Sequence, residues 1–332
     1  MPRNRTDKVH NVKQRLLNRL RDGLHRPGDR FMSNRAVAAR FGISYQTAHR
    51  LVTELVMEGH LVRRSAAGTY LPGRPLRRTS VQLLFHHRAQ RRDSFGARLI
   101  HELTIRLDRE RIRWKLTWYA PQAEINLPDK HFPLIWECPH LIERCAADKR
   151  PALLLNDRPP SGLASVYIDS VSTDDFSGGA CAAQLLRDRS SRQTHLAILS
   201  GPTTDARSRA RVDGFTSILP AKVVAAPGWY LEDGLGACAR AIDAGRAGLF
   251  CCNDRLAESV ASHCDRHQIP RPPLVGFDDA PVAERLNLTT IAIPWAEICG
   301  GAVSVIKRRL SGDPATASQQ IFAPRPVIRS FE

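Results

Sequence analysis

The sequence predicts an α/β protein in which an N-terminal winged helix-turn-helix precedes a larger body built on parallel sheets. Residues 1–71 carry helix and hairpin signals in a basic context, short apolar strands alternate with helical segments from Val81 onward, and polar residues recur directly after those strands. With 332 residues, 42% apolar and 25% charged, the chain is long enough for two or three domains with buried cores.

Composition excludes several classes of protein. No run of about 20 uncharged apolar residues suits a membrane-spanning helix. The first residues, MPRNRTDKVHNVKQRL, lack the apolar stretch of a secretory signal. Eight cysteines are too sparse for a disulfide scaffold, so we expect reduced, mostly buried thiols and a cytoplasmic location.

Positive charge is concentrated at the N-terminal end. Residues 1–80 hold 17 Lys and Arg against 5 Asp and Glu, whereas the remaining 252 residues hold 32 against 28. A small basic module joined to a nearly balanced body favours a polyanion such as nucleic acid as the partner of the first part. The alternative is a basic solvated face with no partner.

The first 60 residues contain three predicted helices. The first covers 9–24, where apolar residues recur at three- and four-residue steps. Ser33 is placed to cap a short helix that Gly42 ends, and Ser44 is placed to cap a third helix that Gly59 follows. Two helices joined at a glycine predict a helix-turn-helix.

A predicted hairpin follows these helices. The segments LVRR and TYL surround the turn SAAG, which contains a glycine, and two short strands of this kind form a wing. Residues 72–80, PGRPLRRTS, then combine proline, glycine and arginine, which predicts an inter-domain linker able to lie along DNA phosphates.

The segment RPGDRFMSNRAVAARFGISYQTAHRLVTELVMEGHLVRRSAAGTYL resembles the GntR-type winged-helix family. In that family the second helix of the motif enters the major groove and the wing contacts the minor groove. The sequence departs from the family pattern at Tyr45 and His49, where arginine is frequent, so family operator rules do not transfer. The resemblance implies these DNA-contact candidates: Ser33, Arg35, Ser44, Tyr45, Gln46, Thr47, His49, Arg50, Arg63, Arg64 and Gly68.

The chemistry of these side chains suits double-stranded DNA. Arginine side chains neutralise phosphates, and Gln46 can pair with an adenine edge through two hydrogen bonds. Tyr45 and Thr47 can donate a hydrogen bond to a base or a phosphate. Each residue taken alone could equally be an ordinary exposed helix side chain.

The body predicts alternating strands and helices, which form parallel sheets with helices on both faces. Strands are expected at 81–85, 114–120, 131–137, 152–155, 195–200, 222–226, 247–252 and 273–277, and helices at 95–108, 175–189, 207–217, 233–244 and 254–267. Ligands bind beyond the carboxyl ends of strands in such sheets, so Asn253, Asp254, Asp278 and Asp279 are of interest there. Helix capping is the alternative role, and we expect it for Asp254.

Residues 166–330 resemble the effector domain of the LacI/GalR repressors, through STDDFSGGACAAQLL, HLAILSGPTTDARSRARVDGF, GLFCCNDRLAESV, LVGFDDAPVAERLNLTTIAIP and RPVIRSF. The resemblance implies a two-lobed, periplasmic-binding-protein-like domain over 81–332 that holds a homodimer and binds an effector between its lobes. It assigns effector contacts to Asp174, Arg211, Trp229, Asn253 and Asp278. Only about 11 residues separate strands 114–120 and 131–137, where the family has a helix, so we expect a trimmed first lobe.

Other motifs carry little chemistry. His263, Cys264 and His267 share a helix but have no further ligands nearby, so a metal site is not expected. Cys251 and Cys252 end a buried strand, where core packing is expected rather than redox chemistry. No P-loop, Gly-x-Ser-x-Gly elbow or His-Glu-x-x-His motif occurs, and no cofactor is expected.

These observations predict a DNA-binding transcriptional regulator, not an enzyme. By resemblance it is a repressor, controlled by a sugar, although a purine would also suit the residues. Two alternatives stay open: a DNA-binding dimer whose body has lost its effector, and a winged helix fused to an enzyme domain. The second would need a Schiff-base lysine, and no lysine of the body lies in such a motif.

Overall fold

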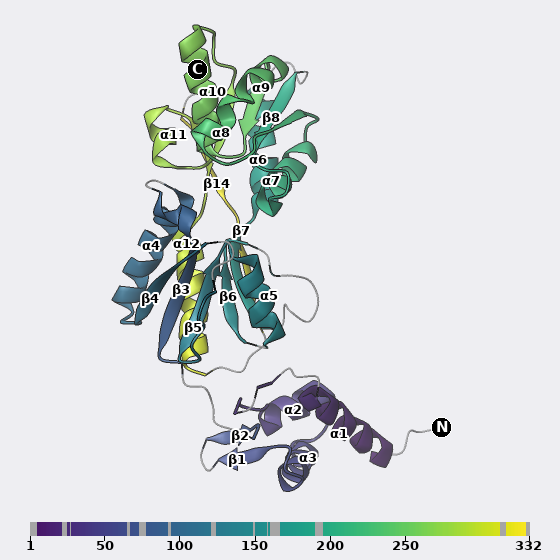
Figure 1. Ribbon diagram of the computed structural model, residues 1–332. Helices are drawn as coiled ribbons and strands as arrows, with labels where there is room; N and C mark the ends of the chain where they lie inside the picture. Colours follow the sequence, from purple (N-terminus) through teal and green to yellow (C-terminus); the bar gives the residue numbers. More distant parts are fainter. Residues whose placement is uncertain are drawn as a thin grey trace. The chain divides into compact units, whose positions relative to one another are not determined.

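The computed structural model describes all residues except 1–4, 22–24, 27, 65–66, 73–77, 92–93, 121–123, 149, 158, 160–166, 190–194, 313–316 and 330–332. Figure 1 labels its helices and strands. The chain divides into two compact units. The first unit comprises Met1–His87, Thr104–Ser170 and Ala302–Gln319, and the second comprises Arg88–Leu103, Val171–Gly301 and Gln320–Glu332. No helix among the described residues is long and apolar enough to cross a membrane.

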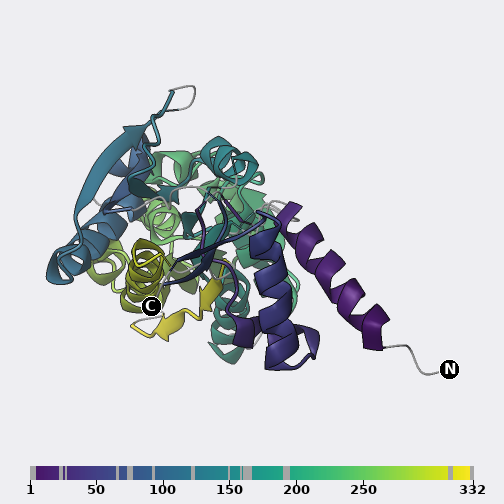
Figure 2. The ribbon, with the colours of Figure 1, turned by 90° about the horizontal axis from the view of Figure 1, so that it is seen from below.

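The N-terminal segment folds into three helices and a hairpin, and Figure 2 shows α1 in purple beside the helices that follow it. The helix α1 starts at Arg5, earlier than predicted, and its predicted end at Leu24 lies outside the described residues. These elements surround one core of apolar side chains: Val12, Leu16, Phe31, Val37, Ala48, Leu51, Val52, Leu55 and Leu61. The elements are α1 (Arg5–Arg21), α2 (Asn34–Phe41), α3 (Tyr45–Met57), β1 (Val62–Arg64) and β2 (Gly68–Tyr70).

Local signals in the sequence set these boundaries. The Ser33 hydroxyl accepts a hydrogen bond from the backbone N–H of Ala36, and Gly42 ends α2 in the left-handed conformation at φ 59°. That conformation costs a residue with a Cβ more than it costs glycine. Strands β1 and β2 pair antiparallel, and the Phe31 N–H donates to the Thr69 carbonyl. The tip of the predicted wing, residues 65–66, lies outside the described residues.

A six-stranded sheet with the order β13-β7-β6-β5-β3-β4 forms the centre of the first lobe. Strand β3 pairs parallel with both β4 and β5, and β5 pairs parallel with β6. Its strands are β3 (Ser80–His86), β4 (Trp114–Tyr119), β5 (His131–Trp136), β6 (Ala152–Leu155), β7 (Ile168–Thr173) and β13 (Gln319–Phe322). The accompanying helices are η1 (His87–Gln90), α4 (Phe95–Arg109), α5 (Pro139–Ala147) and α12 (Trp295–Leu310).

The connection from β4 to β5 contains no helix in its described part, residues 124–130. Side chains hold this segment instead. Arg150, 6% exposed, donates to the carbonyls of Leu127 (2.5 Å), Pro128 (2.6 Å) and His131 (3.2 Å), and the Ile125 carbonyl accepts from Arg144 at 3.0 Å. Ile125 and Leu127 are buried against the sheet, so an irregular segment covers part of the face that a helix would otherwise cover.

The second lobe has its own six-stranded sheet, with the order β14-β12-β11-β10-β8-β9. Its pairings are parallel except for β12 with β14. The strands are β8 (Leu196–Ser200), β9 (Lys222–Ala225), β10 (Gly248–Cys251), β11 (Leu274–Asp278), β12 (Thr289–Ala292) and β14 (Arg325–Val327). The helices are α6 (Asp175–Arg189), α7 (Ala206–Thr216), α8 (Leu231–Leu235), α9 (Cys238–Ala244), α10 (Asp254–His267) and α11 (Pro281–Arg285).

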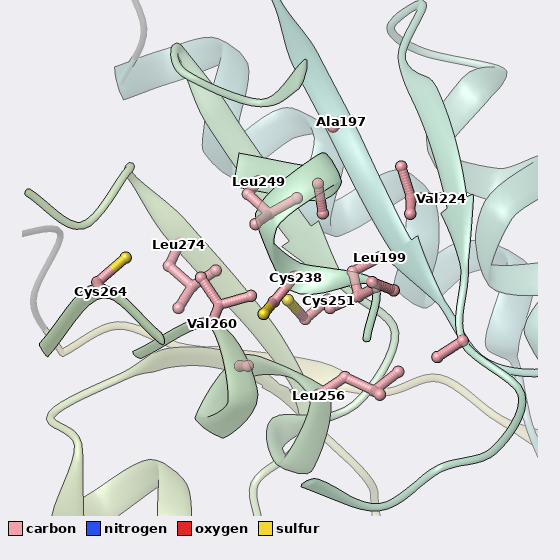
Figure 3. Close-up of a cluster of buried hydrophobic side chains, with 14 of the residues drawn as sticks. Ala197, Leu199, Val224, Cys238, Leu249, Cys251, Leu256, Val260, Cys264 and Leu274 are labelled. Atoms are coloured by element: carbon pink, nitrogen blue, oxygen red, sulfur yellow. The ribbon is translucent and has the colours of Figure 1, made fainter. Parts of the chain in front are cut away.

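The core of this lobe contains several cysteines. Figure 3 shows the sulfur atoms of Cys238 and Cys251 among aliphatic side chains such as Leu249 and Val260. Burial raises the pKa of Cys252 to about 12, and all eight cysteines of the chain are free thiols. A thiol with a raised pKa is a weak nucleophile. These cysteines therefore pack as small apolar residues, as predicted for Cys251 and Cys252.

Several elements differ from the prediction, which did not include η1, α11, α12 or the strands β7, β12, β13 and β14. The single helix expected over 233–244 is two helices, α8 and α9, because Gly236 ends α8 and leaves a break before Cys238. Helix α5 was not predicted, although Pro139 occupies its first turn, where proline is favoured.

Candidate functional site

The exposed face of α3 carries four of the predicted DNA-contact residues: Tyr45, Gln46, His49 and Arg50. The opposite face is buried in the apolar core of the N-terminal segment, residues 1–71. It comprises Ala48, Leu51, Val52 and Leu55. This separation leaves the polar side chains of α3 on the surface of the domain, where a groove of DNA could receive them. Arg50 lies 3.7 Å from Glu54 on the same helix, an exposed ion pair that a phosphate could replace.

An open hollow lies between α2, the start of α3 and the hairpin. Six predicted residues line it together with four that were not predicted. None of the lining residues is acidic, so four arginines make this surface strongly positive. The lining comprises Arg30, Phe31, Ser33, Asn34, Arg35, Tyr45, Arg63, Arg64, Gly68 and Thr69.

Arg30 is a basic residue of this hollow that sequence reasoning missed. It pairs with Tyr70 across an isolated β-bridge. A Cβ at Gly68 would lie 3.1 Å from Arg30 Nε, and Gly68 has φ +116°, so glycine is favoured there on both counts. The Pro-Gly-Asp sequence directly before Arg30 was the available signal.

Three of the predicted contact residues form hydrogen bonds that stabilise the starts of α2 and α3. Ser33 and Ser44 cap α2 and α3, and the Thr47 hydroxyl shares a 2.8 Å hydrogen bond with the Ser44 hydroxyl. Two wing arginines are also oriented by neighbours. Arg63 donates to the Thr53 hydroxyl at 3.2 Å, and the Arg64 guanidinium lies 4.4 Å from the ring centre of Tyr70. These contacts hold the cations in place beside the hollow.

A second cluster lies at the carboxyl ends of strands in the second lobe and centres on Arg211. This side chain, from α7, is 3% exposed. Its Nε donates to Asp175 at 2.8 Å, and its Nη1 donates to the Cys252 carbonyl at 2.5 Å and to Asp278 at 3.3 Å. The guanidinium lies 3.7 Å from the ring centre of Phe277. Within the described part of the chain, its Nη2 has no hydrogen-bond partner.

Trp229 and Asn253 join the same cluster. The Trp229 ring lies 5.6 Å from the Arg211 guanidinium, and its Nε1 donates to Asp205 at 3.1 Å. Asn253 donates from Nδ2 to the Trp229 carbonyl at 2.8 Å. A Cβ at Gly201 would lie 2.8 Å from the indole, so a residue without a Cβ lets the ring lie over the end of β8.

Asp174 does not contact this group. Both of its carboxylate oxygens accept hydrogen bonds from Ser177, from the backbone N–H at 3.1 Å and from the hydroxyl at 2.6 Å. The next residue, Asp175, reaches Arg211 instead. The carboxylate that the structure brings to Arg211 is therefore that of Asp175, which sequence reasoning did not select, and the effector contact of Asp174 stays a prediction.

At the start of α10 the capping residue is also the neighbour of the one we expected. We expected Asp254 to cap this helix, but the cap is Asn253, whose Oδ1 accepts from the Leu256 N–H at 2.8 Å. Asp254 is the first residue of the helix and is fully buried. It accepts hydrogen bonds from the Thr290 hydroxyl at 2.6 Å and the Ala280 N–H at 2.7 Å.

Burial changes the acid–base properties of this cluster. It raises the pKa of Asp278 to about 6, although the Arg211 guanidinium favours the ionised form. Burial also raises the pKa of Asp254 well above its usual value, with the nearby Asp278 carboxylate adding to the effect. Asp278 has φ +104°, a conformation that is strained for any residue with a Cβ. Strained residues and shifted pKa values concentrate at functional sites.

The histidine pair on α10 stays apart from this chemistry. His263 and His267 lie with ring centres 4.3 Å apart. The described residues contain no group of three or more histidines, cysteines or carboxylates arranged to hold a metal ion.

Comparison with known proteins supports the fold of the body. The model of the periplasmic binding protein-like domain matches residues 183–330. Among solved structures, a LacI transcriptional regulator from a Rhodococcus species superposes with a TM-score of 0.65 at 19% identity, covering 76% of this chain and 97% of that one. The body therefore has the two-lobed periplasmic-binding-protein-like fold, which it shares with LacI-family regulator structures.

Two further structures were solved with a sugar. The transcriptional regulator CelR in complex with cellobiose superposes with a TM-score of 0.66 at 15% identity, over 91% of this chain and all of that one. A LacI-family regulator from Enterococcus faecium with bound ribose gives 0.63 at 20% identity, over 76% and 98% of the two chains. At these identities the likeness is one of fold.

A curated relative matches only a short segment. The histidine utilization repressor of Klebsiella aerogenes is 40% identical over 60 residues, which is 18% of this chain. The matched part covers about a quarter, 25%, of the length of that repressor.

Proposed function

We propose that this protein is a DNA-binding transcriptional regulator that represses its target and responds to a small effector. The observation that carries the DNA-binding half is the hollow beside α3, where Arg30, Arg35, Arg63 and Arg64 lie together without an acidic residue in the lining. The exposed residues of α3 would read base edges, while these arginines would contact phosphates on either side. The partial match to a repressor supports this assignment.

Fluorescence anisotropy with the full chain and labelled duplexes would test DNA binding. Two arginines of the hollow can be neutralised in the double variant Arg35→Gln and Arg63→Gln. We expect weaker binding and a salt dependence reduced by roughly 0.9 log units of affinity per log unit of salt for each lost phosphate contact. Arg246→Gln, which neutralises an arginine with a 75% exposed side chain in the second lobe, is the matched control and should bind as the wild type does.

The proposed effector is a sugar bound at the Arg211 cluster. A guanidinium held by two carboxylates leaves Nη2 for a ligand hydroxyl, and a carboxylate beside it can accept from a second hydroxyl. The Trp229 indole would cover the apolar face of a sugar ring. The fold shared with a cellobiose complex and a ribose complex supports this ligand class. A purine remains the second candidate, because indole stacking with Asn253 and Asp278 also suits a base edge.

Thermal denaturation in the presence of a panel of sugars and purines would identify the effector through a raised Tm. Arg211→Ala should abolish that rise and the effector response while leaving DNA binding intact. Arg246→Ala should preserve both. If Arg211→Ala still released DNA at wild-type effector concentrations, the effector site would lie elsewhere in the chain.

We further propose that the protein is a cytoplasmic homodimer without enzymatic activity. The Arg211 cluster offers polar and apolar contacts to a ligand. It does not contain an activated nucleophile among its described residues. A pyridoxal absorbance band on the purified protein would instead support the alternative of a fused enzyme domain.

A further inference from the structure

The amino-terminal edge of the first-lobe sheet, opposite the edge where effectors bind in such folds, is rich in cations. Arg78 lies two residues before β3, Lys130 directly precedes β5, and Arg150 lies two residues before β6. The edge is continuous, because the Thr79 N–H donates to the Lys130 carbonyl at 2.9 Å and the Ala152 N–H donates to the Tyr167 carbonyl at 3.2 Å.

Two carboxylates near this edge, those of Asp169 and Asp129, already pair with arginines. Asp169, on β7, accepts hydrogen bonds at 2.7 Å from both Arg308 and Arg309 of α12. Asp129 lies 3.3 Å from Arg150, but its side chain is 62% exposed. Arg308 and Arg309 therefore share the buried Asp169 carboxylate, and Arg150 is compensated by backbone carbonyls and Asp129. Arg78 forms no ion pair with a described residue.

Several buried donors at this edge lack an acceptor. Among the described residues, Arg78 Nε, Arg150 Nε and the Tyr167 hydroxyl are buried without a hydrogen-bond partner. Burial, reinforced by neighbouring guanidinium groups that include Arg150, lowers the pKa of Arg78 to about 10. An unpaired buried cation is costly, and so is each unsatisfied donor, unless a ligand completes the site.

We propose that Arg78, Arg150 and Tyr167 bind a phosphate-type oxyanion at this edge. A phosphate offers three or four acceptor oxygens, and an arginine such as Arg78 can bind it through paired N–H groups. Arg150 would add its Nε, because its Nη1 and Nη2 already donate to backbone carbonyls. Two sources present this chemistry: a free phosphate or phosphate ester in solution, and a backbone phosphate of bound DNA, which the position of Arg78 within the predicted linker 72–80 would allow.

The experiment measures the Tm of the full chain as inorganic phosphate is titrated at constant ionic strength. The wild type should show a saturable rise in Tm. Arg78→Gln should weaken phosphate binding by roughly 10- to 100-fold, the loss expected for hydrogen bonds to a charged group. Tyr167→Phe should weaken it by a smaller factor, and Arg246→Gln should match the wild type. Without phosphate, Arg78→Gln should have an unchanged or higher Tm, because it removes an uncompensated charge.

A second arm identifies the source. Binding of a random-sequence duplex is measured against salt in phosphate-free buffer for the wild type and for Arg78→Gln. A log–log slope reduced by about 0.9, with no phosphate effect on Tm, assigns the oxyanion to DNA. A phosphate-dependent Tm with an unchanged slope assigns it to a free anion. If neither the Tm nor the slope responds to Arg78→Gln, the proposed site is wrong. It is also wrong if sodium chloride, titrated in place of phosphate, gives the same rise in Tm. Should Arg78→Gln not fold, Tyr167→Phe in the same phosphate titration decides the question.

This site and the proposed regulator function fail independently. A chain that bound phosphate but no DNA would keep the first and lose the second. DNA binding that depended on Arg35 and Arg63, with neither the Tm in phosphate nor the salt slope responding to Arg78→Gln, would do the reverse.

Discussion

Arg211 gathers the second-lobe cluster into one unit, because its guanidinium contacts residues from α6, β11 and the end of β10. The pattern of polar residues after strands pointed to Asn253 and Asp278, since parallel strands end at a common edge. The resemblance to the LacI/GalR effector domain added Arg211. Neither signal could tell which of Asp174 and Asp175 contacts Arg211, or which of Asn253 and Asp254 caps α10. A shift of one residue at a helix start changes the direction of a side chain by about 100° on a helix of 3.6 residues per turn.

Gln46 is exposed on α3, where it could reach a base edge. We expect Gln46→Ala to reduce the preference for operator over random DNA by about 1–3 kcal/mol. Arg64→Ala should weaken both complexes about equally, because a phosphate contact carries no sequence information. Anisotropy titrations with an operator and a scrambled duplex measure both effects. Equal losses on the two duplexes for Gln46→Ala would argue against base readout by this residue.

Asp278 should make the stability of the protein depend on pH. Its pKa is raised to about 6 in the folded state, so its contribution to stability is fully present below about pH 4 and is lost as the pH rises through 6. The change is roughly 2–3 kcal/mol. In Asp278→Asn this contribution is absent, so the Tm of the variant relative to the wild type should increase between pH 4 and pH 7. A Tm difference that stayed constant over this range would contradict the raised pKa.

At the scale of elements, most helices and strands follow from the period of apolar residues, and helix α10 has the predicted bounds of 254–267. The exceptions have physical causes. Gly236 divides the expected helix at 233–244, and α5 was hidden because it is short and lies beside residues whose apolar pattern belongs to β5 and β6. The irregular cover over residues 124–130 had no periodic signal, since distant side chains hold it.

Helices α6 and α7 approach closely enough to exclude a Cβ at their crossing. A Cβ at Gly179 would lie 2.0 Å from the Arg211 carbonyl oxygen, which is backbone and cannot rotate away. Gly179→Ala should therefore destabilise the second lobe by about 1–3 kcal/mol or more, and it should displace Arg211 and weaken the effector response. Denaturant unfolding measures the first effect, and thermal shift with the effector measures the second.

Gly300 in α12 is the matched control for this substitution. A Cβ there would meet no atom within 4 Å. Gly300→Ala should be neutral or should stabilise the protein by about 0.5–1 kcal/mol, because alanine favours a helix. Similar losses in the two variants would show that close helix packing is not the cause.

At the scale of the whole molecule, we expect a dimer whose two basic N-terminal segments, residues 1–71 of each chain, bind two half-sites on DNA. A single winged helix offers a small interface, and specific operators are usually bound by dimers. We expect light scattering at micromolar concentration to give twice the mass of one chain, and footprinting to reveal an inverted repeat. A monomeric mass both with and without DNA would contradict this.

The contacts of Arg144 and Arg150 with the segment 125–127 predict fast hydrogen–deuterium exchange in this part of the first lobe. The segment from Ile125 to Leu127 has its carbonyls bound by side chains, yet none of its amide N–H groups donates to a described residue. Exchange reports the fate of amide hydrogens alone. This stretch should therefore take up deuterium early, as a flexible loop does, although Ile125 and Leu127 are packed into the core. Rapid labelling there would show a segment held by side-chain packing and by its carbonyl acceptors, without hydrogen-bonded amides.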